Sequence, residues 1–186
     1  MTSSLTAVVS AGEEVIVPSP YFPEYKVFIE RCGGVIREVL CDEKLQLDVH
    51  AIENAINEKT AAIIINSPNN PTGVIYTEEN IIALCDTLRR GEEKYGHAIY
   101  LISDEPYREI VFGGFEVPWI PHIYKDTIVC YSFSKSLSLP GERLGYVLVP
   151  EEVTDGDQVY AAVAGAGRSQ GYVNAPSLFQ QVTSLC

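Results

Sequence analysis

Six apolar runs rich in valine and isoleucine, each bounded by turn-forming residues, constrain the fold of this chain more than any other feature. Most of these runs are apolar throughout and do not alternate between apolar and polar residues. A continuous apolar run is typical of a strand buried on both faces, as in a parallel sheet covered by helices. The six runs are Glu14–Pro18, Val35–Leu40, Ala61–Ser67, Ile99–Asp104, Thr127–Ser132 and Gly145–Val149.

Helical patterns fall between the apolar runs. Asp48 and Thr77 are residues of the type that caps a helix, and each precedes an amphipathic segment. The segment from Phe22 to Cys32 also has a helical pattern, and the glycine pair after it is a typical helix stop. Strands that alternate with helices predict an α/β protein, here a three-layer αβα sandwich with a mostly parallel sheet.

The charge balance argues against some classes of partner. The net charge of the 186-residue chain is −12, and its basic residues are scattered, so we expect no binding to nucleic acid or to an anionic membrane. No apolar run approaches the roughly 20 residues that span a bilayer, and no leader is evident, so a cytoplasmic location is expected. The five cysteines include no CxxC pair, which predicts reduced structural thiols and no metal site.

Polar and reactive residues follow four of the apolar runs. In an open α/β sheet, ligands bind beyond the carboxyl ends of the strands, so we expect these four segments to meet at one edge. The segments are PSPYFPEY, NSPNNPTG, SDEPYREI and SFSKSLSLPGER.

The last of these segments contains groups suited to an aldehyde and a phosphate. Lys135 can form a Schiff base with an aldehyde if its amine is desolvated or lies near other cations. Ser132, Ser134 and Arg143 can bind a phosphate, and the arginine offers a bidentate fork.

The other three segments contain groups suited to a heteroaromatic ring. Asp104 can pair with a protonated ring nitrogen, and Tyr107 and Asn70 can reach a phenolate oxygen. Tyr21 offers a flat face on which a ring can stack. An aldehyde, a phosphate, a pyridinium and a phenolate together describe pyridoxal 5′-phosphate, whose usual partners are a lysine and an aspartate.

The chain resembles the class I/II (fold-type I) pyridoxal-phosphate-dependent aminotransferases. The matching segments are VPSPYFPEY, INSPNNPTG, SDEPYREIVF and SFSKSLSLPGERLGYV, in the family's order and approximate spacing, from about Glu14 to Pro150. The resemblance implies that Lys135 carries the cofactor and that Asp104 pairs with its pyridine nitrogen. It implies the ring and phosphate contacts given above for the other six residues, and a cis bond before Pro71.

The resemblance also implies the reaction. An amino group would move between an amino acid and a 2-keto acid, and a buried Asp104 would keep the cofactor nitrogen protonated. Lys135, its pKa lowered by burial and by the cationic cofactor, would remove and return the proton. The family is typically dimeric, so a homodimer is expected.

Family members are longer chains. We expect residues 1–156 to form a cofactor-binding large domain whose N-terminal part is missing, with Met1–Ser10 as the remainder of a helix. Residues 157–186 are expected to form a helical connection toward an absent C-terminal small domain. One strand of the family's sheet would be absent, which would leave another strand exposed as an edge.

Other functions fit the residues less well. A carbon–sulfur lyase or a cyclopropane-forming synthase would share most cofactor residues, although NNPTG is the form usual in transaminases. A truncated, non-catalytic fragment is a further alternative. Ser132 to Lys135 fits the SxxK motif of penicillin-binding proteins and β-lactamases. In those enzymes the SDN and KTG motifs follow SxxK, whereas the segments of this chain that resemble them precede it. The segment GAGRSQG has one residue too many for the dinucleotide-binding motif GxGxxG and follows no clear strand, so we expect no dinucleotide site there.

Overall fold

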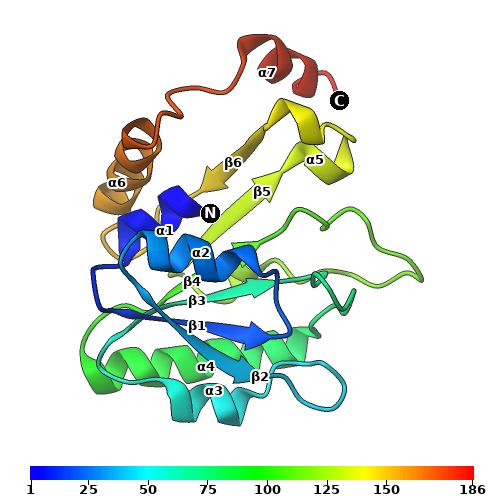
Figure 1. Ribbon diagram of the computed structural model, residues 1–186. Coiled ribbons are helices and arrows are strands. Elements are labelled where there is room, and N and C mark those ends of the chain that lie inside the picture. Colours follow the sequence, from blue (N-terminus) through cyan, green and yellow to red (C-terminus); the bar gives the residue numbers. More distant parts are fainter.

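A six-stranded sheet with helices on both faces forms the centre of the protein (Figure 1). The computed structural model describes residues 1–186. The strand order is β2-β1-β3-β4-β5-β6, with the first five strands parallel and β6 antiparallel to β5. The predicted α/β class with a mostly parallel sheet is confirmed. The strands are β1 Glu14–Ser19, β2 Val35–Leu40, β3 Thr60–Asn66, β4 Tyr100–Asp104, β5 Thr127–Ser132 and β6 Gly145–Leu148.

The helices occupy two layers. α3 and α4 cover one face of the sheet, and α1, α2 and α6 lie on the other side (Figure 1). Short 3-10 turns cover Ile120–His122 and Pro140–Glu142. The helices are α1 Thr2–Val8, α2 Glu24–Arg31, α3 Val49–Ala55, α4 Glu78–Tyr95, α5 Phe133–Ser136, α6 Gly156–Ser169 and α7 Ser177–Thr183.

The continuous apolar runs serve two hydrophobic cores at once. Because successive side chains of a strand point to opposite faces, Ile63 and Ile65 of β3 pack with α3 and α4, whereas Ile64 packs with α1 and α2. All three side chains are at most 1 % exposed. The two cores fix β3 and its neighbours as the rigid centre of the sheet, which is the part that carries the site.

The two edge strands do not have the two-sided burial that their apolar sequences suggested. In β2, Leu40 is 76 % exposed, and in β6, Tyr146 is 47 % exposed. Each of these strands has a neighbour on one side only, and the helices cover the middle of the sheet more fully than its edges. The outer edge of β6 is unpaired.

The helix caps lie where the sequence placed them. The Asp48 carboxylate accepts a hydrogen bond from the Ala51 amide at 2.9 Å, and α3 follows it. The Thr77 hydroxyl accepts one from the Asn80 amide at 3.2 Å, and α4 follows it. α4 then ends at Gly96, whose φ of 76° lies in the left-handed region that glycine adopts freely.

Loss of the Thr77 cap should cost measurable stability. We expect Thr77→Ala to lower the free energy of unfolding by about 1 kcal/mol, because it leaves the Asn80 amide without its side-chain acceptor. Urea denaturation followed by circular dichroism measures the change. Thr77→Ser keeps the hydroxyl and should retain most of the stability; equal losses in both variants would contradict the capping role.

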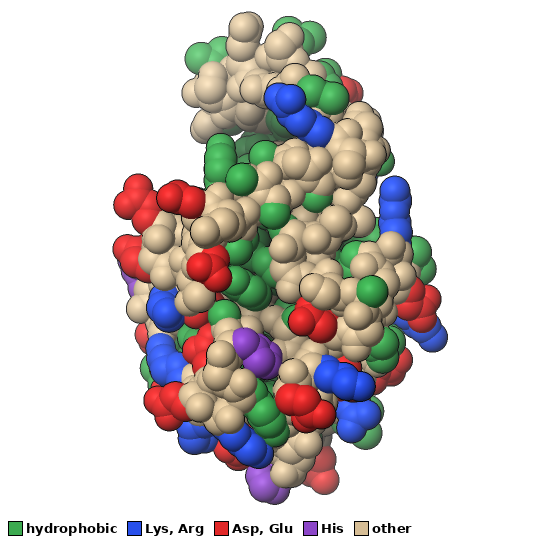
Figure 2. All heavy atoms as spheres, turned by 90° about the vertical axis from the view of Figure 1, so that its left-hand side faces the viewer, with side chains coloured by type: hydrophobic (Ala, Val, Ile, Leu, Met, Phe, Trp, Pro, Cys, Tyr) green, Lys and Arg blue, Asp and Glu red, His purple; other side chains and the backbone are tan.

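The surface carries charges of both signs. On the face shown in Figure 2, Lys and Arg side chains lie among Asp and Glu side chains and do not gather in one place. None of the helices combines the length and hydrophobicity that crossing a bilayer demands. All five cysteines are free, and Cys85 and Cys130 are buried.

Candidate active site

A cavity of about 870 Å³ lies beyond the carboxyl ends of the central strands. Its wall includes the last residues of three strands, Asn66 of β3, Asp104 of β4 and Ser132 of β5. This is the edge of the sheet where an open α/β fold binds ligands. Seven of the eight residues singled out in the sequence line it: Asn70, Asp104, Tyr107, Ser132, Ser134, Lys135 and Arg143.

Asn66 joins the NSPNNPTG segment to β4, a role that the sequence did not reveal. Its side-chain amide donates to the Asp104 carbonyl oxygen at 2.8 Å, and its side-chain oxygen accepts from the Asn70 amide at 2.6 Å. It is 2 % exposed and stands opposite Asp104 in the parallel register. One buried amide therefore fixes Asn70 and Asp104 relative to each other. A polar residue closing an otherwise apolar run was the available signal.

Asp104 lies deep in the cavity wall and keeps partial access to solvent through the cavity. Burial raises the pKa of its carboxyl group above the ordinary value. A hydrogen bond from the Tyr25 hydroxyl, at 2.5 Å from Oδ2, and the positive N-terminal amine both act to lower that pKa. The carboxylate is thus a buried negative charge supported by specific donors, as a partner for a cationic ring nitrogen must be.

Lys135 lies on the short helix α5, which follows β5 at the mouth of the cavity. Its Nζ is 5.7 Å from the centroid of the Tyr107 ring, so the amine and the segment after β4 approach each other. The expected burial of Lys135 is wrong for this structure, because the residue is exposed. α5 has only four residues, and Lys135 is the one among them that is exposed, at the rim of the cavity.

Tyr107 and Asn70 share one side of the cavity. Burial raises the pKa of Tyr107, and the charge of Asp104 raises it further, whereas the Asn70 side chain acts to lower it. The phenol therefore keeps its proton at neutral pH and remains a hydrogen-bond donor. Asn70 and Tyr107 are therefore neighbouring polar side chains in the cavity lining.

The hydroxyl groups of Ser132 and Ser134 lie side by side. The Ser132 hydroxyl donates to the Ser134 hydroxyl at 2.8 Å and accepts from the Ser134 amide at 3.2 Å. Arg143 lines the same cavity with a backbone φ of 55°, an uncommon conformation for a residue other than glycine. Its guanidinium donates to the Pro140 carbonyl oxygen at 2.9 Å and leaves further donors free.

Tyr21 does not line the cavity, in contrast to the sequence-based expectation. Its hydroxyl donates to Glu38 of β2 at 2.9 Å, and its ring stacks on Tyr25 with centroids 6.4 Å apart. The neighbouring Phe22 lines the cavity instead and packs edge-to-face on Tyr25 at 5.6 Å. In a turn between a strand and a helix, no simple periodicity tells which of two adjacent aromatic rings faces inward.

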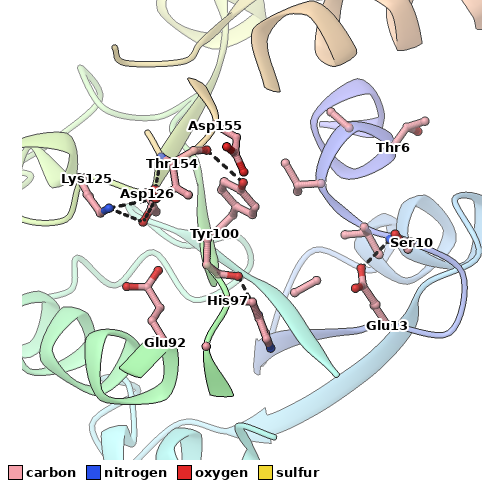
Figure 3. A pocket seen from close by; sticks show the side chains of 16 residues that line it. Thr6, Ser10, Glu13, Glu92, His97, Tyr100, Lys125, Asp126, Thr154 and Asp155 are labelled. Atoms are coloured by element: carbon pink, nitrogen blue, oxygen red, sulfur yellow. Dashed lines mark hydrogen bonds and ion pairs between the residues drawn. The ribbon is translucent and has the colours of Figure 1, made fainter. Parts of the chain in front are cut away.

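A second cavity, of about 710 Å³, lies at the opposite ends of the strands (Figure 3). Its polar groups bind one another: Asp126 accepts from the Thr154 amide at 2.5 Å, and Lys125 donates to the Thr154 hydroxyl at 3.0 Å. The Tyr100 hydroxyl donates to the Thr154 carbonyl oxygen at 3.1 Å. These bonds anchor the segment before α6 to the sheet, so a structural role accounts for the polar groups that make them.

The fold and the first cavity define a class of protein. The protein is an αβα sandwich with a cavity beyond the carboxyl ends of its parallel strands. The cavity is lined by a lysine, an aspartate, paired hydroxyl groups and an arginine, which is the arrangement of a pyridoxal-phosphate-dependent protein. The donor set fits the cofactor, and the cavity volume lies within the roughly 300–1,000 Å³ of small-molecule sites.

Comparisons with known proteins identify the family. The sequence model of the family "Aminotransferase class I and II" matches residues 2–183. A probable aspartate/prephenate aminotransferase of Aquifex aeolicus is 38% identical over 181 residues, which are 94% of this chain and 42% of that protein. An aspartate aminotransferase of Bacillus subtilis is 37% identical over 152 residues, which are 78% of this chain and 37% of that protein.

Solved structures agree. A crystal structure of an amino transferase from Eubacterium rectale has a TM-score of 0.94 and 54% identity, and covers 96% of this chain and 46% of that one. An aspartate aminotransferase from Thermus thermophilus, solved with maleate, has a TM-score of 0.78 and 28% identity, and covers 91% of this chain and 42% of that one. The chain belongs to the class I and II aminotransferase family. It spans less than half the length of the curated relatives it matches.

Proposed function

We propose that this chain provides the cofactor site of a pyridoxal-phosphate-dependent aminotransferase, which moves an amino group between an amino acid and a 2-keto acid. One observation supports this above all: Lys135 and Asp104, 31 positions apart, line the same cavity. When bound, pyridoxal phosphate supplies an electron sink for the charge that develops at the reacting carbon. The names of the relatives favour amino transfer over a carbon–sulfur lyase.

Each side chain has a defined task in this proposal. Lys135 would hold the cofactor through its amine and would carry a proton to and from the reacting carbon. The Asp104 carboxylate keeps a proton on the ring nitrogen because opposite charges stabilise each other at low dielectric. Tyr107 and Asn70 donate to the ring oxygen, which fixes the orientation of the ring.

The remaining cavity residues are assigned to the phosphate group and to the face of the ring. Ser132, Ser134 and Arg143 bind the phosphate through hydroxyl and guanidinium donors. Phe22, in place of Tyr21, presents the aromatic face that stacks on the ring, since Phe22 lines the cavity.

The larger organisation is also a proposal. We propose that residues 1–156 form the cofactor-binding large domain and that residues 157–186, with α6 and α7, form a helical connection to further structure. A homodimer is proposed, as is usual in the family. Aspartate is the first substrate to test, because two of the relatives are named for it.

Pyridoxal phosphate added to the purified protein should produce a visible absorption band. We expect Lys135→Ala to abolish this band, because Lys135 is the only lysine that lines the cavity. Lys44→Ala is the matched control, since Lys44 is exposed and lies outside the cavity. Absence of a band in the unmodified protein, or its persistence in Lys135→Ala, would contradict the proposal.

A further inference from the structure

Tyr25 donates the hydrogen bond to Asp104 that no motif in the sequence suggested. Its hydroxyl lies 2.5 Å from Oδ2, at the short end of the range for a bond to a carboxylate. Tyr25 comes from α2, and Asp104 ends β4, 79 positions later. The contact therefore joins the helical layer directly to the floor of the cavity.

The packing of Tyr25 holds its hydroxyl in place. The residue is 2 % exposed, and its ring contacts Tyr21 by stacking and Phe22 by an edge-to-face arrangement. A fully buried ring with aromatic neighbours has few alternative rotamers, so its hydroxyl cannot follow a moving carboxylate. The direction of the Asp104 side chain is consequently set by Tyr25.

We propose that Tyr25 is a positioning residue, which holds Oδ2 of Asp104 so that the carboxylate stays charged and presents its other oxygen to the cavity. This role rests on the proposed function, in which that carboxylate meets the ring nitrogen of the cofactor. Tyr25 does not touch the reacting atoms. It acts through Asp104, whose charge would otherwise be disfavoured by burial.

The protonation states agree with this role. Burial raises the pKa of Tyr25 well above its ordinary value, and the charge of Asp104 and the hydrogen bond to it raise this pKa further, so the hydroxyl remains a donor. Tyr25 and the N-terminal amine at Met1 lower the pKa of Asp104, and the charge of Asp104 in turn raises the pKa values of its neighbours Glu105 and Tyr107. Removal of the Tyr25 hydroxyl should therefore raise the pKa of Asp104.

A titration of Asp104 in the cofactor-free protein tests the proposal. Carbon-13 NMR of aspartate-labelled protein reports the midpoint, and the Asp104→Asn variant assigns the signal. We expect Tyr25→Phe, which keeps the ring, to move the midpoint upward by about one pH unit, since it removes a hydrogen bond to a charged group. Tyr124→Phe is the matched control, because this buried tyrosine hydroxyl binds Glu92 and not Asp104.

An unchanged midpoint in folded Tyr25→Phe would overturn the proposal, as would an equal shift in Tyr124→Phe. If Tyr25→Phe does not fold, 3,5-difluorotyrosine at position 25 keeps the shape and makes a stronger donor. The midpoint should then fall, and an unchanged value would overturn the proposal. The experiment uses no cofactor, so its outcome is independent of whether Lys135 binds pyridoxal phosphate.

Discussion

Replacing Gly145 with alanine should lower the free energy of unfolding by about 3 kcal/mol, the largest loss of stability expected from any single methyl group near the site. Gly145 begins β6 and stands opposite Ser132 in the antiparallel register. A Cβ at this position would press into the carbonyl oxygen of Tyr131 and lie 3.2 Å from the Cα of Ser132. Both are backbone atoms, so β5 and β6 would have to separate where the chain enters the cavity wall.

Gly141→Ala is the matched control for this substitution. Gly141 lies four positions earlier, in the turn before β6, and an added Cβ would meet no atom within 4 Å. Its effect on urea denaturation should stay within about 0.5 kcal/mol. If both variants were equally stable, the close approach of β5 and β6 at Gly145 would be disproved.

Asp104→Asn should separate cofactor affinity from stability. We expect the affinity for pyridoxal phosphate to fall by about 10- to 100-fold, because a charge-assisted hydrogen bond is worth roughly 1.5–3 kcal/mol and each 1.4 kcal/mol is tenfold. Absorbance titration with the cofactor measures the change. Glu142→Gln removes a carboxylate from the same cavity and should have little effect, since Glu142 has no part in the proposed ring contacts.

The same variant should be at least as stable as the unmodified protein at pH 7. The pKa of Asp104 is raised above its ordinary 3.8, so the folded state binds this proton more tightly than the unfolded state and ionisation disfavours folding. Asparagine removes that cost. Urea denaturation should show a higher free energy of unfolding for Asp104→Asn than for the unmodified protein. This difference should shrink as the pH falls through the pKa of Asp104. A large loss of stability at pH 7 would contradict this.

The strands and the caps were predictable from the sequence because they depend on local chemistry. Continuous valine and isoleucine runs predicted all six strands to within a residue or so at each end, and Asp48 and Thr77 predicted two helix starts. The edges were less predictable, since a sequence does not show which strands lie outermost. β2 contains the charged residues Arg37 and Glu38, whereas β6 is apolar in sequence and yet mostly exposed.

The candidate site was predictable where residues follow a strand and less so elsewhere. Asp104 and Ser132 lie at strand ends, so the fold alone brings them to the cavity. Tyr25 and Asn66 act through hydrogen bonds across 79 and 38 positions, and no local pattern contains such partners. The exchange of Tyr21 for Phe22 depends on the path of one turn, which spacing does not determine.

The order of strands in the sheet has a consequence for how the protein acquires its ligand. The cavity takes its wall from β3, β4, β5 and β6, which are adjacent in space but span Thr60 to Leu148 along the chain. Parallel strands pair only after long crossovers close, and such distant contacts form slowly. A growing polypeptide thus has no complete pocket until β6 has left the ribosome and docked, so cofactor binding requires completed assembly of the sheet.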